Sequence, residues 1–326
     1  GTCTLTFYPG YPMLGRWIAK HLHKPIDFAL WYTSLVAAFF TFFVWTCRTM
    51  TDRLGVTGAW ISLIALNAYG PSCYLVFIGT EGCAVALTFL SFVAFMKKWR
   101  LAAAFCAGAA SAIRISGVAA SMALCCALLV EVIEHPPRKL LEWLERIACV
   151  PLSAWGAFVV MIFFSKRFGD AFIYARAHEL IYHHEASLEH LLHPKPEWIM
   201  HGLDNPMHDG MWVVGLVLWF LLGYKALVRH FPSAERVYMV VLVVATLGIS
   251  VYGSLDLFSL GLSRYALVAF PLFLAIGELL RRRPFVLLVW LSLCRWHYTE
   301  ADLCYYEGDL GRNGLQKCNL TQWVSY

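Results

Sequence analysis

The sequence has 326 residues, of which 60% are hydrophobic and 14% are charged, and its mean hydropathy is +0.61. Soluble domains carry about 25% charged residues, so this composition excludes an ordinary soluble protein and predicts a polytopic membrane protein in a lipid bilayer. The formal charge of +5 does not indicate nucleic-acid binding, because the basic residues lie in short turns between apolar runs.

The first stretch with a clear pattern is aromatic and rich in proline. Residues 7–12 read Phe-Tyr-Pro-Gly-Tyr-Pro, and the prolines predict a rigid turn. Arg16, Lys20 and Lys24 follow at a spacing of four with apolar residues between them. This spacing predicts an amphipathic helix lying in the membrane interface. The alternative is that these residues are the polar start of the next membrane span.

The remaining apolar runs predict about ten membrane passes, since a full span needs about 20 apolar residues. The runs cover residues 28–48, 57–79, 82–96, 101–113, 116–133, 146–165, 211–228, 237–255, 265–280 and 284–298. The fourth and fifth runs are short and would alternatively form one long bent helix, although Ser111, Ser116 and Gly117 favour a break. We therefore expect an all-α transmembrane bundle forming one integral-membrane domain over residues 1–326.

The basic residues predict the orientation of the bundle, because cytoplasmic turns are enriched in Lys and Arg. With the N-terminus outside, every inner turn is short and basic; these turns hold Arg48, Arg53, Lys97, Lys98, Arg100, Arg138, Lys139, Arg146, Lys225, Arg229, Arg236, Arg281, Arg282 and Arg283. The outer face then holds a loop over 166–210 and a polar tail over 299–326. A glycosylation sequon at Asn319 in the tail agrees with this orientation. Cys304 and Cys318, also in the tail, would pair only in an oxidising space.

Polar chemistry is expected to gather on the outer face, where Asp27, Glu81, Arg114, Asp256 and Arg264 all fall. Charges at the edges of apolar segments are expensive and usually have a function. The inner face is expected to carry basic turns with little else. A transporter would be expected to carry functional polar groups near mid-membrane and on both sides, so the one-sided pattern favours an enzyme that opens outward.

Several short motifs, in order along residues 7–283, resemble those of the PIG-V-type mannosyltransferases, which include the GPI mannosyltransferase 2 family and its bacterial relatives. The first motifs are Phe7-Tyr8-Pro9-Gly10-Tyr11-Pro12, Thr80-Glu81-Gly82 and Trp99-Arg100-Leu101-Ala102. The later motifs are Ser111-Ala112-Ile113-Arg114-Ile115-Ser116-Gly117-Val118, Phe168-Gly169-Asp170, and Ser263-Arg264-Tyr265 followed by Phe270-Pro271-Leu272.

The resemblance implies a GT-C-type membrane glycosyltransferase. Such enzymes take a sugar from a polyprenyl-phosphate donor, usually dolichyl phosphate mannose in eukaryotes, and transfer it on the lumenal or periplasmic side. The implied acceptor is a glycolipid or glycan, as in GPI-anchor biosynthesis. The implied location is the endoplasmic reticulum membrane of a eukaryote or the plasma membrane of a bacterium. No cofactor is firmly implied, although a divalent metal is conceivable.

One element of the family pattern is missing. The family carries an acidic residue upstream of the first motif, as the expected general base, but only six residues precede Phe7 and none is acidic. We expect a truncated start, because the family's first span is missing too and the chain begins with Gly1 rather than Met. The alternatives are a base elsewhere in the chain or an inactive protein.

The motifs assign expected roles to individual residues. Arg114 and Arg264 are predicted to bind the donor phosphate, since guanidinium groups bind phosphate in a bidentate way. The alternative role for Arg114 is an arginine that reaches lipid headgroups from a helix end. The alternative role for Arg264 is a structural ion pair with Asp256. Glu81 is a candidate catalytic or substrate-binding carboxylate. The alternative is that Glu81 only stabilises the N-terminus of a helix by its charge. Asp27 is expected to cap a helix. The predicted substrate-binding residues are Tyr8, Tyr11, Asp204, His208 and Asp256.

The loop over 166–210 contains seven histidines, which makes metal binding conceivable. No spacing within it is a metal signature, however, so an amphipathic interfacial helix is the preferred interpretation and no metal ligands are predicted. Two other functions stay open at this point: a transporter or flippase, and an inactive scaffold that kept the family fold.

Overall fold

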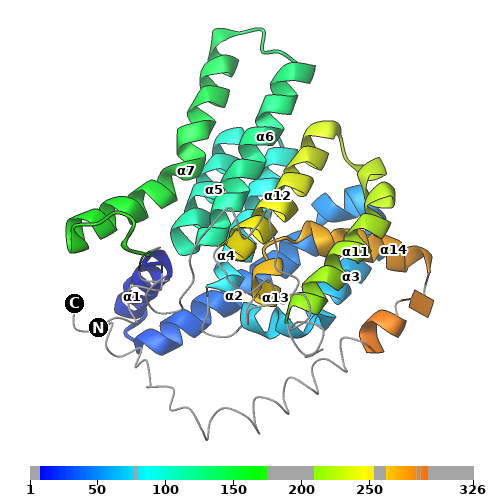
Figure 1. The fold of residues 1–326 in the computed structure, drawn as a ribbon, viewed down its shortest axis with the longest axis horizontal. Helices are drawn as coiled ribbons and strands as arrows, with labels where there is room; N and C mark the ends of the chain where they lie inside the picture. Colours follow the sequence, from blue (N-terminus) through cyan, green and yellow to red (C-terminus); the bar gives the residue numbers. More distant parts are fainter. Residues whose placement is uncertain are drawn as a thin grey trace, which may run out of the picture.

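The fold is taken from a computed structural model, and all of its regular secondary structure is helical over the described residues (Figure 1). The structure describes residues 8–76, 80–174, 176, 209–252, 262–283, 285–286 and 288–292. The predictions for Asp204, His208, Asp256, the two tail cysteines and the sequon lie outside these residues.

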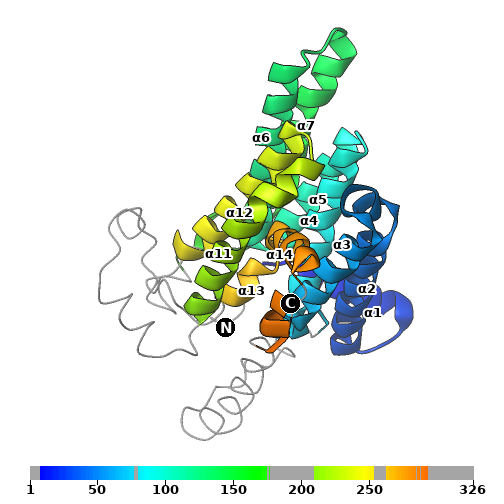
Figure 2. The same ribbon diagram turned by 90° about the vertical axis from the view of Figure 1, so that its right-hand side faces the viewer.

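The helices form one bundle, in which α11 and α12 lie on one side and α1 and α2 on the other, with α13 and α14 between them (Figure 2). The α-helices are α1 Gly10–Leu22, α2 Ile26–Thr46, α3 Arg48–Ala68, α4 Glu81–Met96, α5 Arg100–Ile113, α6 Val118–Glu134, α7 Leu140–Phe168, α11 Asp209–Leu227, α12 Ser233–Tyr252, α13 Leu262–Ala266 and α14 Pro271–Arg282. Short 3₁₀ segments cover Gly70–Leu75, Ile115–Gly117 and Val228–His230.

Three helical segments among the described residues are long and apolar enough to cross a membrane, which agrees with a protein of the lipid bilayer. They are Ile26–Thr46, Ile115–Glu134 and Leu140–Phe168, with 21, 20 and 29 residues. At 1.5 Å per residue each is about 30 Å long or longer, the thickness of a bilayer core. The ten-pass topology stays a prediction.

Several predicted spans differ from the helices observed. Within the expected run over 57–79, the α-helix ends at Ala68 and a 3₁₀ segment follows over Gly70–Leu75. Pro71 has no amide hydrogen to donate, so the α-helix does not continue through it. The expected run over 265–280 is two helices, the second with Pro271 in its first turn. The expected break near Arg114 is confirmed: this residue is extended, with φ −154° and ψ 147°.

Small residues bring α5 and α7 into close contact, as the Ala- and Gly-rich run predicts. A Cβ on Gly108 would lie 2.2 Å from a ring carbon of Trp155, and one on Gly156 would meet the Gly108 carbonyl oxygen. Neither position has room for a side chain. The bundle core also contains packed aromatic rings, with the ring centroids of Trp45 and Phe89 4.8 Å apart.

Helix α1 forms where the spacing of basic residues predicts a helix, and it packs along the first turns of α2. Tyr11 is buried and its hydroxyl donates to the Leu30 carbonyl at 2.8 Å. A Cβ on Gly15 would lie 2.2 Å from Leu30 Cδ2, so this contact is also close. Asp27 does not cap α2 as expected: it lies in the first turn, after the cap residue Pro25. A carboxylate in the first turn still stabilises the helix, because it interacts favourably with the positive end of the helix dipole.

Candidate functional site

Three charged residues predicted to be functional meet at one end of the bundle. Glu81 begins α4, Arg114 directly follows α5, and Arg264 lies in α13. Glu81 Oε1 lies 2.5 Å from Arg114 Nη1 and 3.9 Å from Arg264 Nη1. We call these three residues the outer cluster. One carboxylate between two guanidiniums leaves the cluster with one net positive charge.

Polar and aromatic neighbours hold both guanidiniums in place. Arg114 Nη1 also donates to Thr80 Oγ1 at 2.9 Å. The Arg114 guanidinium carbon lies 4.2 Å from the ring centroid of Tyr265, and that of Arg264 lies 4.9 Å from the Tyr74 ring. Such cation–π contacts fix the plane of a guanidinium and add attraction.

The residues around Arg114 explain why this motif forms a break at that point. The Ser111 hydroxyl accepts the Ala157 amide of α7 at 3.0 Å, which anchors the end of α5. A Cβ on Gly117 would lie 2.2 Å from the Ala110 carbonyl carbon, so only glycine allows the chain to pass there. The extended Arg114 between these two points leaves the helix axis and turns toward Glu81.

Glycine plays a similar part next to Glu81. A Cβ on Gly82 would lie 2.3 Å from the Leu75 carbonyl oxygen and 3.2 Å from that of Ser34. The start of α4 therefore lies directly against the 3₁₀ segment and α2. This contact holds Glu81 at the level of Tyr11, whose hydroxyl is 2.7 Å from Ser34 Oγ.

The two arginines differ in exposure. The side chain of Arg114 is 12% exposed and that of Glu81 4%, while the side chain of Arg264 is 38% exposed. The alternative in which Arg114 faces lipid headgroups disagrees with this burial, because its guanidinium lies against Glu81. Binding of a donor phosphate by Arg114 stays a prediction. Among the residues described, Arg264 lies 3.9 Å from Glu81 and is the more accessible cation. The alternative pairing of Arg264 with Asp256 lies outside these residues.

The structure places the two predicted substrate-binding tyrosines in different settings. Tyr11 is buried with its hydroxyl bonded to α2, so it packs α1 rather than offering a free polar group. The neighbouring Gly10 lies against Ala112, whose carbonyl oxygen would be 2.3 Å from an added Cβ. Tyr8 makes an edge contact with Tyr174 at 4.8 Å, and burial raises the pKa of its phenol to about 12.

The expected outer-loop motif also makes local contacts. The Phe172 amide donates to Asp170 Oδ1 at 2.9 Å, and Arg176 Nε lies 3.3 Å from the other carboxylate oxygen. Gly169, with φ 75°, ends α7 in the left-handed region. In the part of the chain that the structure describes, no group of three His, Cys, Asp or Glu side chains is arranged to hold a metal ion.

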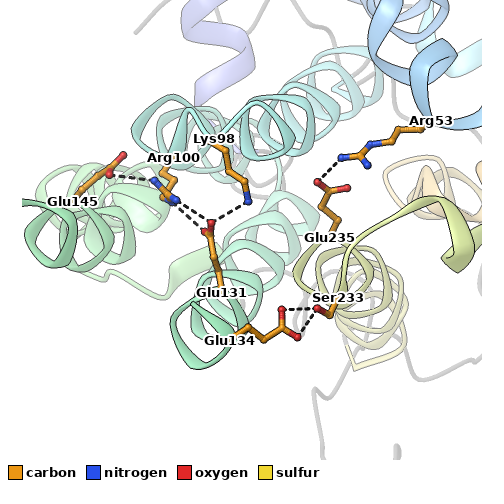
Figure 3. A network of polar contacts seen from close by, with 8 residues as sticks. All are labelled: Arg53, Lys98, Arg100, Glu131, Glu134, Glu145, Ser233 and Glu235. Atoms are coloured by element: carbon orange, nitrogen blue, oxygen red, sulfur yellow. Dashed lines mark hydrogen bonds and ion pairs between the residues drawn. The ribbon is translucent and has the colours of Figure 1, made fainter. Parts of the chain in front are cut away.

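The opposite end of the bundle holds a second set of charges, which sequence reasoning missed. Figure 3 shows this inner network, formed by Arg53, Lys98, Arg100, Glu131, Glu134, Glu145, Ser233 and Glu235. The expectation of basic turns with little else is wrong, because two of its carboxylates, Glu131 and Glu235, are 5% and 2% exposed. The signal available in the sequence was Glu131, an acidic residue inside the apolar run over 116–133.

The network joins turns that are far apart in sequence. Glu131 accepts Lys98 Nζ at 3.0 Å and Arg100 Nη2 at 2.9 Å, and Arg53 Nη2 lies 2.9 Å from Glu235 Oε1. The basic turns thus meet at one end, as the orientation argument requires. Which side of a membrane that end faces stays a prediction.

Comparison with protein-family models, with curated proteins and with solved structures found no match for this chain. The candidate site therefore rests on its own geometry. An accessible guanidinium beside a buried carboxylate–guanidinium pair can bind an anion, and its single net positive charge suits a phosphate group. That capacity is the starting point for the proposed function.

Proposed function

We propose that the protein is a multi-pass membrane glycosyltransferase, acting as a mannosyltransferase, that uses a polyprenyl-phosphate sugar as donor. The observation that carries the proposal is that residues from three separate motifs meet in space. Thr80 and Glu81, Arg114, and Arg264 with Tyr265 come from three motifs that resemble the PIG-V-type family, and they lie in contact at one end of the bundle. Glu81 and Arg114 are 33 positions apart in the sequence, and Arg114 and Arg264 are 150 positions apart. The fold, and not closeness in the sequence, brings them together.

The chemistry of the transfer needs an anion-binding group. The acceptor hydroxyl attacks the anomeric carbon, the bond from that carbon to the phosphate oxygen breaks, and polyprenyl phosphate leaves with the bonding electrons. Fixed cations stabilise the charge that develops on the leaving oxygen. Arg264, at 38% exposure, is the residue we assign to this contact.

Arg114 and Glu81 are assigned to positioning in this scheme. Arg114 is buried and engaged by Thr80 and Glu81, so it holds the cluster together rather than reaching a substrate. Glu81 Oε1 is occupied by a guanidinium at 2.5 Å, so this oxygen is not free to take a proton from an acceptor. The proposal therefore gives the acceptor proton to a carboxylate other than Glu81, as the resemblance implies.

Acceptor and location follow the resemblance as part of the proposal. The acceptor is a glycolipid or glycan on the lumenal or periplasmic side, a GPI precursor being one such glycolipid. The protein would act in the endoplasmic reticulum of a eukaryote or in the plasma membrane of a bacterium. A divalent metal is not required by the scheme.

The test is sugar transfer by the full-length protein in proteoliposomes, with radiolabelled polyprenyl-phosphate mannose as donor and a lipid extract as the source of acceptor. Arg264→Ala is expected to lower the rate about 100-fold, the effect of removing one donor to a developing oxyanion. Arg264→Lys keeps the positive charge but loses the bidentate hydrogen bonding of the guanidinium, so it should give an intermediate rate. Arg229→Ala, an exposed arginine at the opposite end, is the matched control. Unchanged transfer by Arg264→Ala would refute the phosphate contact.

A transporter or flippase is the second candidate, and the inner network is the observation that favours it. Buried carboxylates at both ends, Glu81 and Glu131 among them, are what a substrate path through the membrane would use. The same proteoliposomes separate the two functions. Movement of the labelled donor across the bilayer without transfer would establish transport, and neither transfer nor movement would indicate a scaffold.

A further inference from the structure

Outside the candidate site, the α1–α2 corner carries exposed basic and aromatic side chains. Lys20 and Lys24 are exposed on either side of the end of α1. Between Arg16 and Phe28 the chain has three Lys or Arg residues against one carboxylate, Asp27. We define the corner as residues 16–32.

Large aromatic side chains lie exposed on the same corner. Trp17 is 60% exposed, and Phe28, Trp31 and Tyr32 are each about 40% exposed. The Phe28 ring lies 6.0 Å from the Trp31 ring and 6.2 Å from the Tyr32 ring. Aromatic rings beside lysines are typical of the membrane interface, where the rings lie at headgroup level and the amines reach phosphates.

The geometry of α2 places the corner at that level. α2 has 21 residues and is about 31 Å long, close to the thickness of the hydrocarbon core. When this helix crosses the core, its first residue lies at the boundary. Lys20 and Lys24, which precede that residue, are then in the headgroup layer, with Asp27 at the boundary.

The corner is held in shape by the packing of α1 and by its final turn. Tyr11 and Gly15 fix α1 against α2, as described above. His23 ends the helix in the left-handed region at φ 53°, a conformation that favours glycine, and the Lys24 amide bonds back to the Ala19 carbonyl at 3.2 Å. This turn carries the chain round between Lys20 and Lys24.

We propose that the α1–α2 corner is a binding site for the headgroup of an anionic phospholipid. Lys20 and Lys24 contact the headgroup phosphate, and Trp17, Phe28 and Trp31 lie against the upper acyl chains. Charge complementarity favours an anionic lipid over a zwitterionic one, because only one carboxylate, Asp27, lies among the three cations of the corner's sequence. The inference goes beyond the proposed transfer function and does not depend on it.

The experiment measures lipid retention by native mass spectrometry of the whole protein in detergent, titrated with phosphatidylglycerol or phosphatidylcholine. A lysine near an anionic surface contributes about 1 kcal/mol, or about fivefold in affinity. Lys20→Gln with Lys24→Gln is therefore expected to weaken phosphatidylglycerol binding about 25-fold and leave phosphatidylcholine binding unchanged.

The matched control is Lys97→Gln with Lys139→Gln, which removes the same charge from exposed lysines of the inner turns. This control should keep the affinity for phosphatidylglycerol. An unchanged affinity in the Lys20/Lys24 variant would overturn the proposal. An equal loss in both double variants would also overturn it, since the effect would then be one of total charge.

Discussion

Glu81 illustrates how the cost of a buried charge constrains a site. A carboxylate that is 3% exposed is strongly destabilising without a partner, and here Arg114 supplies a contact of 2.5 Å. The reverse also holds, because Arg114 is itself buried. Each residue therefore depends on the other, and the pair is expected to be structural as well as functional.

Replacing one member of this pair should destabilise the protein more than replacing both. Glu81→Gln leaves the Arg114 charge buried without its counter-ion, which costs about 3–5 kcal/mol of unfolding free energy. Glu81→Gln combined with Arg114→Gln removes both charges and should recover part of that loss. Thermal unfolding in detergent, followed by intrinsic fluorescence, measures both variants.

The exposed Asp52→Asn is the control for loss of one carboxylate and should unfold at the wild-type temperature. A double variant as unstable as the sum of its single variants would show that the two side chains do not interact.

At the scale of helices, close packing depends on glycines at the ends and crossings of α4, α5 and α7. A Cβ added to any of three glycines would lie only 2.2 or 2.3 Å from a backbone or ring atom of a neighbouring residue. These glycines are Gly82, Gly108 and Gly117. These positions differ from Gly248 of α12, where nothing lies within 4 Å of an added Cβ. Glycine in this protein therefore has two distinct roles, which substitution separates.

Gly117→Ala should destabilise the protein and disturb the outer cluster. The added methyl forces the Ala110 backbone to move, and overpacking of this kind costs about 1–3 kcal/mol. Gly248→Ala should leave stability unchanged or raise it by about 1 kcal/mol, because alanine is the better helix former. Unfolding temperatures of the two variants give the comparison, and a loss of the same size in both would contradict the packing argument.

At the scale of the whole molecule, charge is concentrated at the two ends of an apolar bundle. The inner network links the α4–α5 turn to α6 and α7, and links α12 to α3 and α6, while the outer cluster links α4, α5 and α13. Within the network, Lys98 is 55% exposed in its side chain and has φ 63°, whereas Arg100 is 16% exposed and bonds two carboxylates. The two residues are therefore expected to contribute differently to stability.

Lys98→Gly should leave the unfolding temperature nearly unchanged. It loses an exposed ion pair worth about 0–1 kcal/mol and relieves left-handed strain of about 1–2 kcal/mol. Arg100→Ala should lower the temperature clearly, since Glu131 would lose its most buried partner. Equal losses in the two variants would show that the network acts only through its total charge.

The sequence could predict the helical class, the break at Arg114, and the gathering of Glu81, Arg114 and Arg264 at one end, because apolar runs and the charges that interrupt them are visible in it. It could not predict the contact of Glu81 with both arginines, since that depends on the close packing that Gly82 and Gly117 allow. Glu131 and Glu235 were missed for a related reason: their cationic partners come from other helices. Pairing across helices leaves no spacing pattern in a single sequence.

The length of α4 has a consequence for any lipid-borne substrate. Its 16 residues span about 24 Å, which is about 6 Å less than the hydrocarbon core. If α4 crosses the core as predicted, with Lys97 at one interface, the outer cluster would lie below the surface on which headgroups rest. A phosphate would descend to reach Arg264 while its acyl or prenyl tail stays among the lipids. Under the proposed function, the donor would then enter sideways from the leaflet, and local thinning of the bilayer would shorten that descent.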